Sequence, residues 1–313
     1  MITNTYSLIN EAYKTDLNNN KITNEKNILN SIYYKLNDIV PINSYTVLTD
    51  VSISYPAAQI TSIQNLSGKI YLTDPKSQYV YSIPESNEST PTIFESLSTG
   101  ISIPEYITYS LAKSSLFLYD LNKGLLSVSQ NGSLSPIISP IQGSDITAIQ
   151  AYAGNIYLLD SKTGSMYEAN TSTLSYSKLF SSSKLKEASS FAIDGNIFAV
   201  SKNGSILRFY ANTLTPFSVS NSNYMEYSLN NVSFIYDNQY INDLYVLNPS
   251  HNRIVVLQKP SAGATNTVDY SFVKQYVYFG KSNIFKNMDA MALSSSGNTI
   301  YILSGSKVVK INI

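Results

Sequence analysis

The chain has 313 residues, of which 43% are hydrophobic and only 13% are charged. That hydrophobic share supports a complete folded core and argues against disorder. The 21 basic and 21 acidic residues balance to a net charge of zero, which argues against the basic surface that nucleic acids or anionic membranes require. Cysteine is absent, so disulfides, thiolate metal sites and cysteine nucleophiles are excluded.

The first forty residues differ from the rest of the chain. Apolar residues recur there every three or four positions in two runs, which predicts helices over about 4–16 and 24–39. Pro41 ends the second run. We expect residues 1–40 to form an αα-hairpin, either as a cap packed on the following domain or as a linker that continues upstream toward a membrane or another domain. The sequence contains no signal-peptide pattern and no apolar run of transmembrane length.

From residue 45 onward, short apolar strands alternate with turns rich in Gly, Asn, Ser and Pro. One strand pattern recurs, with the form Ile-Tyr-Leu-Leu-Asp at 156–160, and we call these strands the marker strands. Their intervals of 40 to 56 residues are close to the ~40–50 residues of a four-stranded propeller blade. The chain is therefore predicted to be all-β, with a six-bladed β-propeller over 41–313. The marker strands start at Ile70, Leu116, Ile156, Ile197, Leu244 and Ile300.

The last predicted blade is one strand short. The blades are expected at about 58–96, 105–139, 145–180, 188–220, 231–280 and 288–313. Only three strands fit after residue 288, whereas the segment 45–53 upstream of the first blade has the composition of a strand. We predict that 45–53 completes the last blade and closes the ring, because the alternative leaves an unpaired edge at the junction.

Each marker strand ends at Asp, Asn or Ser. Asp120 is followed four residues later by Gly124, and Asp160 is followed in the same way by Gly164. Glycine at this distance predicts hairpin turns that need a positive φ.

A resemblance to known propellers is carried by two segments, DITAIQAYAGNIYLLDSKTGSMYEA at 145–169 and GNTIYILSGSKVVKINI at 297–313. They resemble the repeats of the broad group that includes NHL-repeat, SMP-30-like and TolB-like proteins. The resemblance covers about 45–313 and implies an architecture, because propellers host unrelated functions. The absence of Trp excludes the WD dipeptide and the Asp-box of sialidases.

The sequence contains few residues in patterns that are typical of catalytic sites. His251 is the only histidine and lies in a turn between strands. It could serve as a general base or metal ligand, but we favour a turn residue, since one histidine cannot build a multi-histidine site. The several histidines that the resemblance associates with an NHL-type lyase are missing. We find no Gly-rich phosphate loop and no Gly-x-Ser-x-Gly elbow.

Acidic residues lie at or near the starts of several expected innermost strands, where they would surround the axial channel. A ring of carboxylates there would suit Ca²⁺, and the resemblance implies a calcium ion of this kind for SMP-30-like lactonases. The set is incomplete and no calcium-loop motif is present, so we expect strand caps or a wet channel and no cofactor, with Ca²⁺ as the alternative. The candidate ligands are Glu105, Asp145, Glu187 and Asp289.

Tyrosine is abundant, with 26 residues, and most of them are expected to fill space between blades. Those in loops and insertions are candidates for a binding face, because Tyr supplies contact area at a low entropy cost. The candidates are Tyr224, Tyr227, Tyr240, Tyr276 and Tyr278.

These observations favour a non-enzymatic binding, scaffold or sensor propeller that contacts a protein or a glycan. We expect it outside the cytoplasm, as part of a larger cell-envelope or surface protein, because its polar surface consists mainly of Ser, Asn, Thr and Tyr. Two alternatives stay open: a calcium-dependent, lactonase-like hydrolase with its site in the axial channel, and a lectin-like module.

Overall fold

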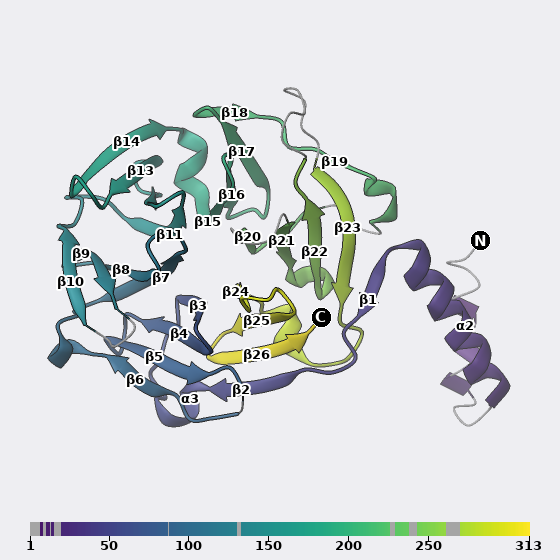
Figure 1. Ribbon diagram of the computed structural model, residues 1–313. Coiled ribbons are helices and arrows are strands. Elements are labelled where there is room, and N and C mark those ends of the chain that lie inside the picture. The colour runs from purple at the N-terminus through teal and green to yellow at the C-terminus, as the bar shows by residue number, and fades with distance from the viewer. Residues whose placement is uncertain are drawn as a thin grey trace.

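The computed structural model shows six β-sheets arranged like blades around a central axis (Figure 1). It describes residues 7–8, 11–12, 14–15, 20–86, 88–129, 133–225, 229–237, 243–260 and 270–313. The innermost strands contact one another in chain order, and the innermost strand of the last blade contacts that of the first. The chain is therefore an all-β, six-bladed propeller, as the sequence predicts.

The first three blades are four-stranded antiparallel sheets. Blade one consists of β3 (Ser62–Leu66), β4 (Lys69–Asp74), β5 (Tyr79–Pro84) and β6 (Thr92–Glu95). Blade two consists of β7 (Pro104–Ser110), β8 (Ser115–Asp120), β9 (Gly124–Val128) and β10 (Leu134–Ile138). Blade three consists of β11 (Ile146–Tyr152), β12 (Asn155–Asp160), β13 (Ser165–Asn170) and β14 (Ser175–Ser181).

Among the last three blades, blades five and six each include a strand from the N-terminal segment. Blade four consists of β15 (Ala188–Ile193), β16 (Ile197–Ser201), β17 (Ile206–Tyr210) and β18 (Thr213–Thr215). Blade five consists of β20 (Phe234–Asp237), β21 (Asp243–Asn248), β22 (Arg253–Gln258), β23 (Tyr270–Val277), β19 (Val219–Ser220) and β1 (Ile39–Pro41). Blade six consists of β24 (Ala290–Leu293), β25 (Thr299–Ser304), β26 (Lys307–Asn312) and β2 (Thr46–Asp50).

The N-terminal strand β2 closes the ring. It pairs antiparallel with the last strand of the chain, with Thr46 opposite Lys310 and Asp50 opposite Lys307. Leu48 of β2 is 2% exposed and packs in the core between blades six and one. The predicted closure is thus confirmed, and β2 supplies the strand that the last blade lacks.

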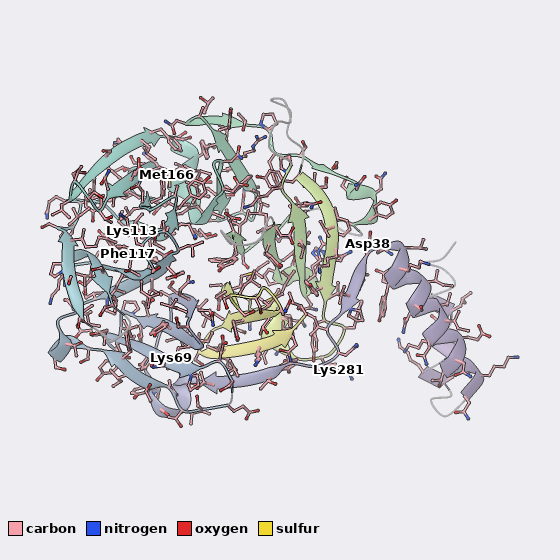
Figure 2. The ribbon with its side chains drawn as sticks, viewed as in Figure 1. Asp38, Lys69, Lys113, Phe117, Met166 and Lys281 are labelled. Atoms are coloured by element: carbon pink, nitrogen blue, oxygen red, sulfur yellow. The ribbon has the colours of Figure 1, made fainter. Side chains whose placement is uncertain are left out.

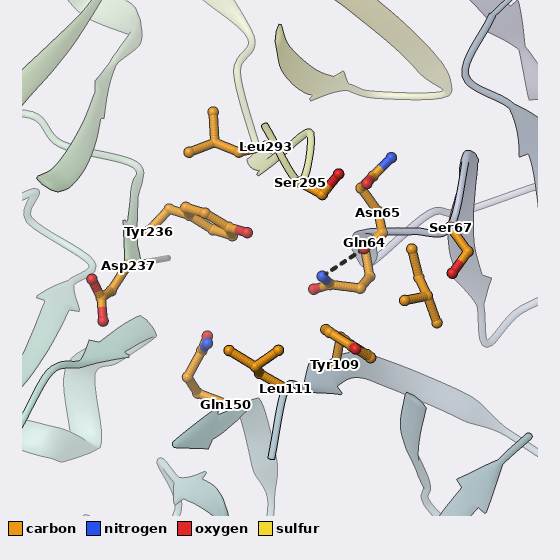
Figure 3. Close-up of a pocket in the computed structure, with 11 residues that line it drawn as sticks. Gln64, Asn65, Ser67, Tyr109, Leu111, Gln150, Tyr236, Asp237, Leu293 and Ser295 are labelled. Atoms are coloured by element: carbon orange, nitrogen blue, oxygen red, sulfur yellow. Dashed lines mark hydrogen bonds between the residues drawn. The ribbon is translucent and has the colours of Figure 1, made fainter. Parts of the chain in front are cut away.

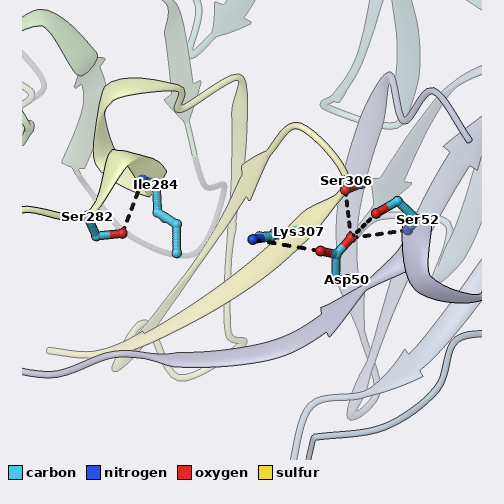
Figure 4. Close-up of polar contacts among 6 residues, drawn as sticks. All are labelled: Asp50, Ser52, Ser282, Ile284, Ser306 and Lys307. Atoms are coloured by element: carbon cyan, nitrogen blue, oxygen red, sulfur yellow. Dashed lines mark hydrogen bonds and ion pairs between the residues drawn. The ribbon is translucent and has the colours of Figure 1, made fainter. Parts of the chain in front are cut away.

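The predicted strand 45–53 extends beyond the C-terminal end of the observed strand β2, which is Asp50. Residues 51–54 form a short helix, α3 (Val51–Ser54), because Asp50 acts as its N-cap and accepts a hydrogen bond from the Ser52 N–H at 3.1 Å. The hydroxyl of Ser306 donates to the same carboxylate oxygen at 2.7 Å (Figure 4). Asp50 therefore joins the end of β2 to the turn before β26.

A second attachment of the N-terminal segment was not predicted. The three-residue strand β1 runs parallel to β23 on the outside of blade five. The Gln275 N–H donates to the Asp38 carbonyl at 2.9 Å, and the Ile42 N–H donates to the Val277 carbonyl at 2.8 Å. Ile42 is buried in the core that blades five and six share. The segment 38–50 thus holds two adjacent blades.

The N-terminal helix α2 (Asn20–Leu36) lies outside the ring (Figure 1). It begins four residues before the predicted start and ends three before the predicted end, and the ring of Tyr34 stacks on Phe279 with centroids 5.2 Å apart. Of the predicted first helix, residues 7–8, 11–12 and 14–15 are helical, and the rest lies outside the described residues. None of the helices in the described part of the chain is long and apolar enough to cross a bilayer.

Asp160, which ends the marker strand of blade three, connects two parts of that blade by hydrogen bonds. Asp160 is fully buried, and its Oδ1 accepts from the main-chain N–H groups of Asp145 at 3.0 Å, Lys162 at 3.1 Å and Thr163 at 3.3 Å. It therefore links the segment that enters the blade to the following hairpin turn. The turn closes at Gly164, whose φ of +70° leaves no room for a Cβ beside the Ser182 carbonyl.

Short 3-10 turns connect several blades and hairpins. They are η1 (Leu97–Thr99), η2 (Ser183–Glu187), η3 (Ser222–Tyr224), η4 (Pro249–His251) and η5 (Asn283–Lys286). The side chain of Ser282 caps η5 by accepting from the Ile284 N–H (Figure 4). Figure 2 shows how side chains fill the space between the blades.

Candidate functional site

The axial channel is the candidate site, since all six innermost strands contribute to its wall. A cavity of about 730 Å³, which we call the wide chamber, lies in it. Apolar side chains form part of its wall, and hydroxyl groups form much of the rest. The hydroxyl-bearing residues of the wall are Thr61, Ser62, Tyr106, Thr108, Thr147, Ser189, Ser190, Ser233 and Tyr236.

A ring of polar residues surrounds the entrance to the wide chamber. Each blade places one residue at the start of its innermost strand, opposite the end of its marker strand. In blades two, three and four this residue is the extra one of a β-bulge, which turns its side chain away from the regular pleat. In blade order, the entrance ring consists of Thr61, Glu105, Thr147, Ser189, Ser233 and Asp289.

The predicted calcium ligands divide between this ring and its surroundings. Glu105 and Asp289 belong to the entrance ring, whereas Asp145 and Glu187 each lie two residues before a ring position and are exposed. Burial raises the pKa of Glu105, and the carboxylates of Asp145 and Asp120 add to the rise. Burial also raises the pKa of Asp289, although the Gly305 N–H bound to it opposes the shift. Within the described residues, no three His, Asp or Glu side chains gather as a metal site would require.

A collar of three long side chains separates the wide chamber from a second cavity. Gln64, Gln150 and Tyr236 line both cavities. They come from blades one, three and five, and each pairs across its hairpin with the aromatic residue of a marker strand. The equivalent residues of blades two, four and six are small, so long and short side chains alternate around the axis. These small residues are Thr108, Ala192 and Ala292.

The second cavity, which we call the narrow chamber, opens among the hairpins that follow the innermost strands. It has a volume of about 540 Å³, and Figure 3 shows the side chains around it. Three carboxamides, two tyrosines and three leucines contribute to its wall. The wall consists of Gln64, Asn65, Leu66, Ser67, Tyr109, Leu111, Gln150, Tyr236, Asp237, Leu293 and Ser295.

His251 lies in η4 and is tied to its own turn. Its Nδ1 is 3.0 Å from the Asn248 Oδ1 and 3.0 Å from the Ser250 hydroxyl. Burial lowers the pKa of His251, and the nearby Arg253 lowers it further. The imidazole lies outside both chambers' walls, so the structure agrees with the interpretation of His251 as a turn residue.

The described tyrosines of the predicted binding face lie in different environments. Tyr224 is 48% exposed in η3, and Tyr278 is half-buried and stacked on Phe285 with centroids 4.3 Å apart. Tyr276 is a correction: it is 2% exposed in the core between blades five and six, because its position on β23 faces inward. Tyr227 and Tyr240 lie outside the described residues.

Asp237 gives the narrow chamber a testable pH dependence. Its carboxylate is almost fully buried and forms an ion pair with Lys259. Burial raises the pKa of Asp237 to about 7, Lys259 opposes the rise, and Asp194 adds to it. The folded chain therefore keeps this proton up to about pH 7, whereas the ordinary value for an unfolded aspartate is 3.8.

Because the folded state binds the extra proton, the contribution of Asp237 to the free energy of unfolding should fall as the pH rises from about 4 to about 7. Urea unfolding at pH 5, 6, 7 and 8 measures this. The wild-type curve should fall relative to that of Asp237→Asn, which cannot titrate. Parallel curves for the two proteins would contradict the assignment.

No protein-family model and no curated protein sequence matches the chain. Solved structures do match it. A virginiamycin B lyase from Staphylococcus aureus shares 12% identity over 86% of this chain and 100% of its own, with a TM-score of 0.52. The fold is shared and the sequence is not.

Two further structures extend the likeness to other propellers. A gluconolactonase from Xanthomonas campestris has 8% identity over 87% of this chain and 90% of its own, with a TM-score of 0.54. The WD40 repeats of RRP9 have 11% identity over 86% and 97%, with a TM-score of 0.55. These structural matches show the propeller architecture expected from the resemblance, and the proteins themselves differ in function.

Proposed function

We propose that the chain is a non-enzymatic binding propeller that holds a partner at the entrance of its wide chamber. The observation that carries the proposal is the entrance ring, in which five of the six blades contribute a hydroxyl- or carboxyl-bearing residue to the wall of the wide chamber. The four hydroxyl groups of the ring already donate to main-chain carbonyls, so they offer acceptors to the donors of a polar partner such as a protein loop or a glycan.

Two features favour binding over catalysis. The described residues supply no cluster of three metal-binding side chains, and His251 is held in a turn away from the channel. A calcium-dependent hydrolase would need Glu105 and Asp289 to share an ion with main-chain or hydroxyl oxygens, whereas the Asp289 carboxylate accepts a hydrogen bond from the Gly305 N–H. A lectin-like module is the form of the proposal in which the partner is a glycan. We further propose a location outside the cytoplasm, supported by the low charge and the Ser, Asn and Thr content.

The test is to close the entrance with one side chain. Ser189 is exposed on the ring, so Ser189→Trp should block the opening without disturbing the core. Ser175→Trp makes the same change on the exposed outer strand β14 and is the control. The full chain and both variants are applied to a glycan array and to an array of synthetic peptides.

We expect the wild type and Ser175→Trp to bind the same array members, and Ser189→Trp to lose at least about 90% of that signal, because a bulky ring residue excludes the partner. Equal binding by Ser189→Trp would contradict the proposed site. Hydrolysis of glucono-1,5-lactone by the wild type in the presence of Ca²⁺, lost in Ser189→Trp, would support the hydrolase instead.

A further inference from the structure

The narrow chamber plays no part in the proposed function, yet its wall has the composition of a binding site. It lies beyond the collar, at the opposite end of the channel from the entrance ring. It encloses about 540 Å³ of space, part of which is open to solvent. Side chains from blades one, two, three, five and six contribute to it.

The carboxamides of the collar have hydrogen-bonding capacity to spare. Among the described residues, the Gln150 side chain has no hydrogen-bond partner. The Gln64 Nε2 donates to the Asn65 main-chain carbonyl at 3.1 Å, and its Oε1 accepts from no described group. Both side chains reach toward the middle of the cavity (Figure 3). Each carboxamide combines a donor and an acceptor in one plane, which matches the donor and acceptor of another amide.

The rest of the wall excludes ions and favours an apolar group. Asp237 is the one charged residue of the described wall, and it is already paired with Lys259. Above about pH 7, where Asp237 has lost its proton, this pair leaves the chamber without a net charge to attract an ionic ligand. Leu111 and Leu293 stand on opposite sides of the opening, near the ring of Tyr236 (Figure 3). These surfaces would cover an aliphatic side chain of moderate size.

We propose that the narrow chamber is a second binding site, and that its ligand is a neutral peptide unit with an aliphatic side chain. The amide of the ligand pairs with the carboxamides of Gln64 and Gln150, and its side chain lies between the two leucines. A charged group is disfavoured, because Lys259 is already paired with the buried Asp237 and offers it no free counter-ion. The site is separate from the entrance ring, so a failure of this proposal would not affect the proposed function, and the reverse also holds.

The probe for this site is N-acetyl-L-leucine N-methylamide, and binding is measured by NMR titration of the full chain. We expect a dissociation constant of about 1 mM, which is ordinary for a neutral ligand of this size. Gln150→Leu and Gln64→Leu keep the size of the side chain and remove its amide. Each should weaken binding at least about fivefold, since one of the ligand's hydrogen-bonding groups loses its partner.

Gln59→Leu makes the same chemical change at an exposed position away from the narrow chamber, and it should bind the probe like the wild type. Ser189→Trp should also bind normally, because it closes only the entrance ring. Thermal melting of each variant shows whether it has kept its fold.

Three results would overturn the proposal. The first is no binding of the probe by the wild type. The second is equal affinity in the wild type and both collar variants. The third is binding of N-acetylglucosamine in place of the leucine probe, which would show that the site reads a sugar acetamide and not a peptide unit. N-acetyl-L-leucine, which carries a negative charge, should bind more weakly than its neutral methylamide, and tighter binding would refute the neutral character of the site.

Discussion

A chain that starts at Val51 should lose on the order of 5 kcal/mol of its free energy of unfolding, because it lacks both strands that hold the ring closed. The loss has two parts. Without β2, one edge of β26 in blade six has no partner. Without Leu48 and Ile42, two cores lose a side chain that is at most 7% exposed.

A total stability of about 5–15 kcal/mol is usual for a folded domain, so we expect this truncated chain to unfold without cooperativity or to aggregate. Urea unfolding followed by circular dichroism measures the difference. The control starts at Asn37 and lacks α2 but keeps both strands and the bond from Gln275 Nε2 to the Asn37 carbonyl. Helix α2 buries none of its residues, so this control should stay within about 1 kcal/mol of the full chain. Equal stability of the two truncated chains would contradict the closure.

Asp160→Ala should cost roughly 3–5 kcal/mol, because it removes the acceptor of three main-chain N–H groups in a buried position. The two parts of the blade that Asp160 joins are the segment entering β11 and the turn after β12. Asp160→Asn keeps one acceptor oxygen and should cost less, about 1–2 kcal/mol.

Lys162→Ala is the matched control, since Lys162 is exposed in the same turn and its main-chain bond to Asp160 does not depend on its side chain. It should change the free energy of unfolding by less than about 0.5 kcal/mol. Guanidinium unfolding of the three variants gives the order directly. If Asp160→Ala were as stable as Lys162→Ala, the residue at the end of the marker strand would have no structural role.

The overall fold was predictable because its strongest signals are local and repeated. The marker strands are apolar at nearly every position, since they are covered on both faces by neighbouring blades. Only three strands fit after residue 288, so the last blade lacked a fourth. Only one unassigned segment was available to supply it. Asp50 marks where that strand ends, but its hydrogen bond from the Ser306 hydroxyl comes from the far end of the chain, which no local pattern reveals.

The additions to blade five could not be predicted. Strands β1 and β19 have three and two residues, too few to show the alternation of a strand. Both run parallel to β23, so their pairing depends on the path of the chain around the ring and not on a hairpin.

The channel was predictable only in part. The acidic residues were expected at the starts of inner strands, and Glu105 and Asp289 do lie in the entrance ring. The bulges that place Glu105, Thr147 and Ser189 in equivalent positions required the strand register. The collar had a usable signal, because Gln64 and Gln150 are polar residues paired with the aromatic residue of a marker strand. That pairing follows from counting back across each hairpin.

The closure of the ring by the N-terminal strand is tested most directly by a disulfide. The chain has no cysteine, so Thr46→Cys with Lys310→Cys introduces one pair at residues that face each other in the β2–β26 register. Mild oxidation should give an intramolecular crosslink in most molecules, identified by mass spectrometry of the joined peptides. Thr46→Cys with Lys307→Cys places the partner at the far end of the register and should not crosslink. Crosslinking of the second pair but not of the first, or crosslinks only between two chains, would contradict the closure.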